Sequence, residues 1–352
     1  MGRKKRKAGE GSVMKLYNAA AVFALALFAL LPCSSADEKI IYGDDDRVEY
    51  YDVPEAFKAA ADSTVSLWKK SGVRADKDSG KYLLATGNFG EAYGLCPDVR
   101  FREQTIGAFC SGSLVGEDLV LTAGHCIESE EKCKDTAFVF GYSISAPGQS
   151  ARTQMTPGEV YTCSKVVKRQ WLDTTLTING KPQTIRGQDY ALVKLDRKVT
   201  GRRPLAINRL GGLKKGDQLS ATGHPNGLPF KFSAEGAVMM EVPKESAYFI
   251  SNLDIFGGNS GGPAFNARTG LIEGIVVRAD AEHFLPSFAG CMVYTTRPQT
   301  AGYGISINKL DEVISEIPLT PGEAAAAAGA QSDLDALRKT RVPPQKDLNL
   351  SF

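Results

Sequence analysis

Short apolar or alternating runs recur along the chain from Phe109 onward, with Gly, Pro, Asn and Asp between them. Short strands separated by turn residues are typical of a β-barrel or a β-sandwich. The pattern therefore predicts an all-β domain whose strands fall into two successive sets. The first set comprises 109–115, 119–123, 137–142, 159–167 and 190–195, and the second comprises 219–223, 232–240, 247–253, 262–265, 271–278 and 303–307.

One segment before these strands has apolar residues at helical spacing, between Val53 and Lys70. Pro54 stands where the first turn of a helix tolerates proline. We therefore predict a helix within an N-terminal segment that spans 37–94. An amphipathic helix of this kind is usually docked on the outside of a domain, and we favour that interpretation. The alternative is a propeptide or inhibitory arm that is removed.

A second helix is predicted after the last strand, capped by Asn308 with Asp311 three residues on. Its apolar stripe consists of Leu310, Val313, Ile314 and Ile317. Beyond residue 317, a five-alanine run and a polar stretch follow, and their composition cannot bury a core. We therefore expect a domain over 95–317 and a flexible tail over 318–352.

The first 36 residues have the pattern of an export signal: basic residues, an apolar run over 19–31, and small residues at Ser34 and Ala36. We predict cleavage after Ala36 and a secreted or periplasmic protein. The run is shorter than the about 20 residues that span a bilayer, so we expect no stable membrane insertion after cleavage. A lipid anchor on Cys33 is a less favoured alternative, because proline precedes it where a small residue is expected.

The chain has 352 residues, 43% of them apolar, and a formal net charge of +2. This length accommodates one all-β catalytic unit of about 200–250 residues with flanking segments. A basic cluster at residues 3–7 lies outside that unit, and no stripe of Lys and Arg interleaved with aromatic residues follows it. Nucleic acid is therefore not an expected partner, and the oligomeric state is left open.

Three short strings carry the residue types that perform acyl transfer. They are Leu-Thr-Ala-Gly-His-Cys, which ends at His125 and Cys126, Gly-Gln-Asp-Tyr-Ala-Leu around Asp189, and Gly-Gly-Asn-Ser-Gly-Gly-Pro around Ser260. A serine hydroxyl is a poor nucleophile, so acyl transfer needs an imidazole to take its proton and a carboxylate to hold that imidazole. His125, Asp189 and Ser260 can fill these roles, in the chain order His, Asp, Ser.

With these strings the sequence resembles the chymotrypsin/trypsin-like serine proteases, from about Phe109 to about Ile317. The resemblance implies two six-stranded antiparallel β-barrels followed by a C-terminal helix, and a polypeptide substrate. It also implies an oxyanion hole made by the backbone N–H groups of Gly258 and Ser260. The chemistry needs no metal and no organic cofactor.

Removal of the signal would leave six cysteines, an even number in a chain bound for an oxidising compartment, so we expect three disulfides. The resemblance implies that Cys110 pairs with Cys126. We pair Cys133 with Cys163 because each flanks a short β-like run, which leaves Cys96 with Cys291. A zinc site is disfavoured because paired ligand spacing is absent and His125 would have to serve as a ligand.

One departure from the trypsin pattern is Asn259, immediately before the proposed nucleophile. Vertebrate-type digestive enzymes carry Asp there, and it pairs with a new amino terminus after activation cleavage. Residues 40–43 resemble such a terminus but begin 85 residues before His125, too far upstream for the usual layout. Without the aspartate no ion pair can form, so Asn259 indicates the bacterial trypsin-like branch.

A second departure concerns specificity. Asp254 lies six residues before Ser260, the offset at which trypsin places the acid that receives Lys or Arg. Arg278, on the strand expected to wall the pocket, could neutralise Asp254 or, with His283, select an acidic side chain. A further alternative is that Asp254 bonds loop amides and Arg278 points to solvent. We favour cleavage after basic residues, and we assign no role to His224.

The leading hypothesis is an exported serine endopeptidase. The alternatives are a catalytically inert binding protein with the same fold, an endopeptidase specific for acidic residues, and an esterase. All three triad positions carry their expected residues, which disfavours the inert protein.

Overall fold

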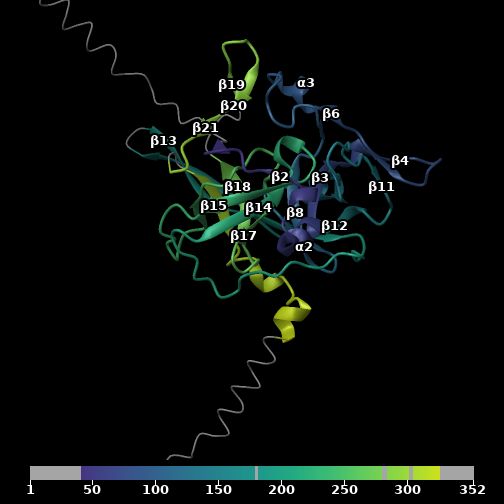
Figure 1. Cartoon of the computed structure of the whole chain (residues 1–352). Coiled ribbons are helices and arrows are strands. Elements are labelled where there is room, and N and C mark those ends of the chain that lie inside the picture. Colours follow the sequence, from purple (N-terminus) through teal and green to yellow (C-terminus); the bar gives the residue numbers. More distant parts are fainter. Residues whose placement is uncertain (1–40, 179–180, 280–283, 301–303, 326–352) are drawn as a thin grey trace, which may run out of the picture. The chain divides into compact units, whose positions relative to one another are not determined.

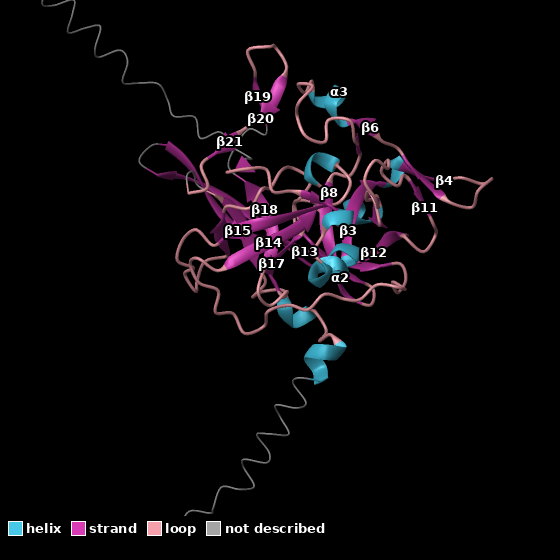
Figure 2. Ribbon diagram, viewed as in Figure 1, coloured by secondary structure: helices cyan, strands magenta, loops and turns pink. Residues whose placement is uncertain are grey.

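The computed structural model describes residues 41–178, 181–279, 284–300 and 304–325. The predicted signal segment and residues 326–352 of the predicted tail lie outside these ranges. Strands dominate the described part, and the helices are few and short (Figure 2). No helix within these ranges is long and apolar enough to cross a membrane.

Six antiparallel strands form a closed barrel. Around the barrel they are β10 (Thr136–Phe140), β12 (Val160–Ile178), β13 (Lys181–Leu195), β9 (Leu119–Thr122), β8 (Cys110–Gly116) and β3 (Thr64–Lys69). Closure leaves no unpaired strand edge. The interior consists of fully buried apolar side chains, among them Val65, Leu67, Leu114, Leu121, Phe138 and Val193.

The strand β3 corrects the prediction of a helix over 53–70. The helix α2 spans Glu55–Ser63 and ends there, and the chain continues as β3, which pairs with β8 and β10. Val65, Leu67 and Trp68 fit helical spacing, but β-branched and aromatic residues buried on both faces suit a central strand. The barrel therefore begins at Thr64, and the predicted domain boundary at residue 95 does not coincide with its edge.

A seven-stranded sheet forms the second half of the fold. Its order is β16 (Tyr248–Ser251), β22 (Ile305–Lys309), β18 (Ile272–Ala279), β17 (Pro263–Asn266), β14 (Gln218–Gly223), β15 (Lys231–Ala237) and β2 (Val48–Glu49). A single bridge between Val238 and Ser251 joins the β15 side to the β16 side. The predicted second six-stranded barrel is not confirmed, because β2 pairs with β15 and one bridge does not close the sheet.

The two halves meet through strands that carry the predicted site. β14 lies near β3 and β8 (Figure 1). β13 contacts β22, so residues far apart in the sequence lie at one boundary. The three disulfides join Cys96 to Cys291, Cys110 to Cys126 and Cys133 to Cys163, which are the expected pairs.

The C-terminal helix differs from the prediction at its start. Asn308 lies inside β22 instead of capping a helix, and a single 3-10 turn, η4, spans Ile314–Glu316. Residues 321–325 form a further helical turn. There Glu323 accepts the Thr320 N–H at 2.7 Å, and Thr320 Oγ1 accepts the Glu323 N–H at 3.3 Å. These reciprocal bonds form a capping box.

The remaining elements are short. They are β1 (Ile41–Tyr42), η1 (Tyr50–Asp52), η2 (Lys70–Gly72), β4 (Val73–Ala75), β5 (Tyr82–Leu84), β6 (Gly87–Asn88), α3 (Phe89–Tyr93), β7 (Thr105–Ile106), α4 (Glu130–Lys134), β11 (Gln154–Met155), η3 (Pro225–Gly227), β19 (Phe284–Pro286), β20 (Met292–Tyr294) and β21 (Thr296–Arg297). β1 pairs in parallel with β21, which ties the N-terminal segment to the second half.

Candidate active site

His125 lies on the loop that follows β9. A Cβ atom on Gly124 would lie 2.1 Å from the Gln170 carbonyl oxygen, so glycine lets this loop pack against β12. The Cys110–Cys126 disulfide ties the residue after His125 to β8. The imidazole is thus held by the barrel and still has 28% of its side chain exposed.

Asp189 holds the imidazole from β13. Its Oδ2 lies 2.8 Å from His125 Nδ1, and its Oδ1 accepts the His125 backbone N–H at 3.0 Å. The Asp189 side chain is 1% exposed. A carboxylate at Nδ1 favours the tautomer that carries its proton there, which leaves Nε2 as an acceptor for a hydroxyl proton.

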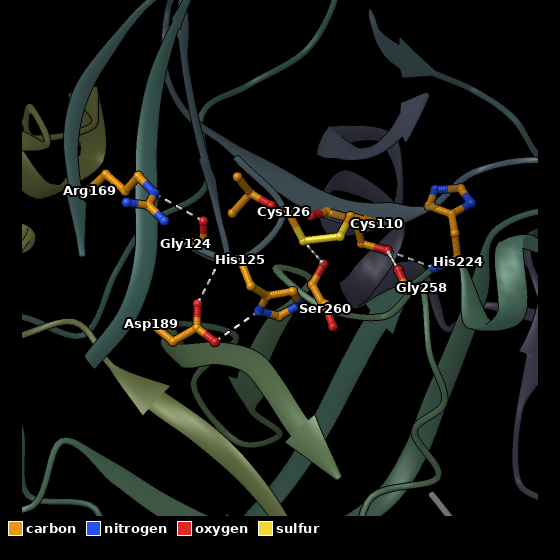
Figure 3. Close-up of a disulfide and its surroundings, with 11 residues drawn as sticks. Cys110, Gly124, His125, Cys126, Arg169, Asp189, His224, Gly258 and Ser260 are labelled. Atoms are coloured by element: carbon orange, nitrogen blue, oxygen red, sulfur yellow. Dashed lines mark hydrogen bonds and ion pairs between the residues drawn. A yellow bond between two sulfur atoms is a disulfide. The ribbon is translucent and has the colours of Figure 1, made fainter. Parts of the chain in front are cut away.

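Ser260 lies on the opposite side of the imidazole from Asp189 (Figure 3). It belongs to the turn that leads into β17, and its carbonyl oxygen accepts the Ser111 N–H at 2.8 Å. Ser260 is 6% exposed. Asp189 thus bonds His125, Figure 3 places Ser260 across the ring, and the catalytic role of the three residues stays a prediction.

The turn before Ser260 is fixed by contacts from both halves. Gly258 has a φ of 85°, and a Cβ atom there would lie 2.4 Å from the His224 carbonyl oxygen, so glycine is required. Ser111 Oγ donates to the Gly258 carbonyl oxygen at 2.6 Å, and the Asn226 N–H donates to the Gly257 carbonyl oxygen. These bonds fix the peptides that carry the predicted oxyanion donors, the N–H groups of Gly258 and Ser260.

Asn259 bonds within its own turn. Its Oδ1 accepts the Phe256 N–H at 3.1 Å, and its N–H donates to the Phe256 carbonyl oxygen at 3.1 Å. The carboxamide therefore stabilises the turn locally.

The structure places Asp254 against the N-terminal segment. Its two carboxylate oxygens accept the backbone N–H groups of Tyr42 at 2.7 Å and Asp46 at 3.2 Å. Burial and the nearby Asp46 carboxylate raise the pKa of Asp254 to about 8. Tyr42 is far from Ser260 in the sequence, yet its N–H contacts Asp254 in the loop before Ser260. Its sequence distance from His125 therefore did not indicate where it lies.

A cavity of about 450 Å³ lies beside Asp254. Four of the residues that line the cavity are carboxylates. The lining residues are Tyr42, Asp44, Asp46, Glu235, Asn252, Asp254 and Gln299. The hydrogen bonds that Asp254 accepts from the Tyr42 and Asp46 amides agree with the alternative in which Asp254 bonds loop amides instead of receiving a substrate side chain.

Arg278 lies next to the predicted triad. Its Nη2 is 3.4 Å from Asp189 Oδ2, and its side chain is 9% exposed, so it does not point to solvent. The ion pair that the structure describes for Arg278 involves Asp189 rather than Asp254. His283, its expected partner in acidic specificity, lies outside the described residues.

His224 is a structural group in a buried turn. Its backbone N–H donates to Ser111 Oγ at 2.9 Å, and its ring stacks on Tyr142 with 5.8 Å between centroids. Burial, with a smaller contribution from the charge of Lys231, lowers the pKa of His224 to about 3. The imidazole is therefore neutral at physiological pH.

Within the described ranges, one group of metal-type donors lies close together: Cys110, His125 and Cys126. Both sulfur atoms are joined in a disulfide, so neither is a thiolate. A zinc ion needs thiolate ligands from such cysteines. The group therefore does not fit a metal site.

Sequence reasoning missed three residues that support the site. Asn308 Oδ1 accepts the Asp189 N–H at 2.9 Å, and Ser111 joins β8 to the nucleophile turn. The indole of Trp171, 42% exposed, has its ring 6.3 Å from that of His125. Their contacts depend on long-range strand pairing, which no local sequence pattern reveals.

A profile of the trypsin-like peptidase domain matches residues 110–275. No curated protein matches the sequence significantly.

Many solved structures match the chain, among them the following three. The VesB protease of Vibrio cholerae is 15% identical with a TM-score of 0.43, and the match covers 76% of this chain but less than two thirds, 64%, of VesB. A Glu endopeptidase in complex with MPD is 14% identical, with a TM-score of 0.40 and coverage of 79% and 97%. An inactive serine-to-alanine form of Rv3671c from M. tuberculosis H37Rv is 12% identical, with a TM-score of 0.37 and coverage of 86% and 99%.

Proposed function

Since the chain carries a peptidase domain that belongs to the trypsin-like family, we propose that it is an exported serine endopeptidase that acts through an acyl-enzyme on Ser260. The observation that carries the proposal is the 2.8 Å contact between His125 Nδ1 and Asp189 Oδ2, with Ser260 across the ring (Figure 3). Substitution or displacement of any of these three side chains would break the arrangement.

In the proposed reaction, His125 Nε2 takes the proton of Ser260 Oγ as that oxygen attacks the carbonyl carbon of the peptide. The N–H groups of Gly258 and Ser260 stabilise the oxyanion. Protonated His125 then gives its proton to the leaving amine, which releases the first product. A water molecule, deprotonated by His125, hydrolyses the acyl-enzyme and restores Ser260, while Asp189 stabilises the imidazolium in both steps.

The substitution Ser260→Ala tests the assignment. The variant should keep its fold by circular dichroism and lose the hydrolysis of a peptide substrate by a factor of at least about 10³. Ser220→Ala, at a buried serine of β14, is the matched control and should keep its activity. Full activity in the Ser260 variant would exclude the mechanism.

A fluorophosphonate probe separates the enzyme from an inert binding protein with the same fold. The proposed nucleophile should be labelled in the parent chain and in Ser220→Ala, but not in Ser260→Ala. An unlabelled parent would favour the binding protein. Hydrolysis of the ester but not of the matching amide would favour an esterase.

Cleavage after Lys or Arg is the finer part of the proposal. It is supported by the offset between Asp254 and Ser260 and by three further carboxylates around the cavity, those of Asp44, Asp46 and Glu235. With a pKa of about 8, Asp254 itself carries its charge only in mildly alkaline solution. A peptide library should show basic residues before the cleaved bond, and Asp254→Ser should abolish that preference. Cleavage after Glu or Asp would favour the acidic alternative, and an unchanged preference would remove Asp254 from the pocket.

Export to an oxidising compartment is supported by the three disulfides. The amino-terminal sequence of the mature protein should begin at Asp37. Retention of residues 1–36 would contradict the proposal, and incorporation of labelled palmitate at Cys33 would favour the lipid anchor.

A further inference from the structure

Arg278 and His125 share one carboxylate oxygen. Arg278 Nη2 lies 3.4 Å from Asp189 Oδ2, and Nη1 donates to the Gly187 carbonyl oxygen at 3.4 Å. The same Oδ2 lies 2.8 Å from His125 Nδ1. When the imidazole is protonated, two cations therefore compete for one oxygen.

Burial makes this contact electrostatically effective. The side chains of Arg278 and Asp189 are 9% and 1% exposed, so water screens their charges poorly. The pairing of β18 with β22 shifts register between Val276 and Arg278. Such bulges re-aim side chains beside active sites, and this one precedes the residue that reaches Asp189.

We propose that Arg278 is a positioning residue that partly neutralises Asp189 and so lets His125 act as a base at lower pH. The inference rests on the proposed function. A carboxylate next to an imidazole favours the charged form of the ring, and a guanidinium on that carboxylate offsets the effect. His125 then stays neutral, as a general base must be, to a lower pH than Asp189 alone would allow.

Other charges near the pair have partners of their own. Arg169 on β12 donates to the Gly124 carbonyl oxygen at 3.1 Å, and Lys309 on β22 pairs with Asp311 at 3.3 Å. Six ionisable residues nearby in the chain have side chains outside the described part: Asp173, Lys181, Arg186, Asp280, Glu282 and His283. A comparison between variants of Arg278 keeps all of these charges constant.

The direct test is an NMR titration of the His125 ring. Arg278→Gln keeps a donor for the Gly187 carbonyl oxygen and removes the charge, whereas Arg278→Lys keeps the charge. Both are made in the Ser260→Ala background, which prevents self-digestion. Burial lowers the pKa of His224 to about 3, so its ring does not titrate between pH 4 and 9, and His283→Gln identifies the remaining signal.

The titration midpoint of His125 should rise by about 0.5–1 unit in Arg278→Gln and stay near the parental value in Arg278→Lys. An unchanged midpoint in Arg278→Gln overturns the inference. Equal rises in both variants also overturn it, because the charge would then not be the cause. If Arg278→Gln does not fold, Arg278→Met replaces it as the neutral variant.

The active enzyme provides the second readout. The acid limb of the kcat/KM profile should move upward by the same 0.5–1 unit in Arg278→Gln, so the rate on that limb falls about 3- to 10-fold. Arg152→Gln removes an arginine paired with Glu159 and should leave the profile unchanged. If the parent chain shows no hydrolysis that depends on Ser260, the proposed function fails, while the titration still decides the role of Arg278.

Discussion

Asn308 accepts the backbone N–H of Asp189 with its Oδ1 at 2.9 Å, and this bond joins the seven-stranded sheet to the barrel at the carboxylate of the site. The Asn308 Nδ2 group donates to Gln188 Oε1 at 2.9 Å and to the Lys309 carbonyl oxygen at 2.6 Å. Both ends of the carboxamide are therefore bonded. Asn308 is fully buried, so no water can replace these partners without rearrangement.

We expect Asn308→Ala to lower kcat/KM about tenfold, because Asp189 loses the bond that fixes its backbone. Loss of a buried hydrogen-bonding group should also lower the free energy of unfolding by about 1–3 kcal/mol. Peptide hydrolysis and urea unfolding measure the two effects. Asn266→Ala, at another buried asparagine that bonds the Arg268 N–H, should be destabilised but keep its kcat/KM. Equal losses of activity would show that Asn308 acts through stability alone.

The raised pKa of Asp254 predicts a specific pH dependence of stability. Its pKa is about 8 in the folded protein, where burial acts first and Asp46 second, against an ordinary value of 3.8. Between these values the folded state binds more protons at Asp254 than the unfolded state, so this residue makes stability fall as pH rises from about 4 to about 8. Asp254→Asn should flatten that slope, as measured by urea unfolding at several pH values.

Asp98→Asn provides the control for the pH experiment, because that carboxylate is exposed. In Asp98→Asn, the slope of the free energy of unfolding against pH should match that of the parent chain. A steeper slope in Asp254→Asn would contradict the sign of the shift, and an identical slope would show that Asp254 is not the titrating group.

The N-terminal segment is expected to be part of the working domain rather than a removable arm. Asp254 accepts two of its amides, and the buried Arg47 guanidinium lies 4.3 Å from the ring centre of Phe256, in the turn before Ser260. A chain that begins at Tyr51 lacks β1 and β2 and should lose most peptide hydrolysis compared with a chain that begins at Asp37. Full activity of the shorter chain would support the propeptide alternative.

Arg47 allows a finer test of the same segment. It forms a bidentate pair with Asp45, at 2.7 Å for each bond, and its side chain is 1% exposed. Arg47→Met removes one partner of a buried pair and should lower the free energy of unfolding by about 3 kcal/mol. Arg100 also pairs with Asp45, at 3.2 Å, but is 45% exposed. Arg100→Met should therefore cost less than about 1 kcal/mol, and similar losses in urea unfolding would contradict this ranking.

The Cys110–Cys126 disulfide closes a short loop, with a sequence separation of 16 residues. Replacement of both cysteines by alanine should lower the free energy of unfolding by about 3 kcal/mol. The variant should also lose activity at temperatures where it is still folded, because the residue next to His125 is released. Loss of stability with unchanged kcat/KM in the folded protein would show that the disulfide does not position the histidine.

The sequence by itself determined the residue types of the site and many of the strands. His125, Asp189 and Ser260 stand in strings whose chemistry is recognisable without coordinates. Strands such as β8, β9 and β17 follow from short apolar runs between turn residues, which is local information. The expected cysteine pairs also occur in the structure.

Tertiary structure decided the features that depend on distant partners. Residues 64–69 fit a helical pattern, but pairing with β8 and β10 on both sides makes them a barrel strand. Asn308 fits a helix cap, but pairing within the second sheet places its side chain on Asp189. Asp254 and Arg278 look like pocket residues by their offsets, yet one bonds amides of the N-terminal segment and the other contacts Asp189. The physical reason is that periodicity reports which face of an element is apolar, whereas the partner of a polar side chain is set by which strands lie together in space.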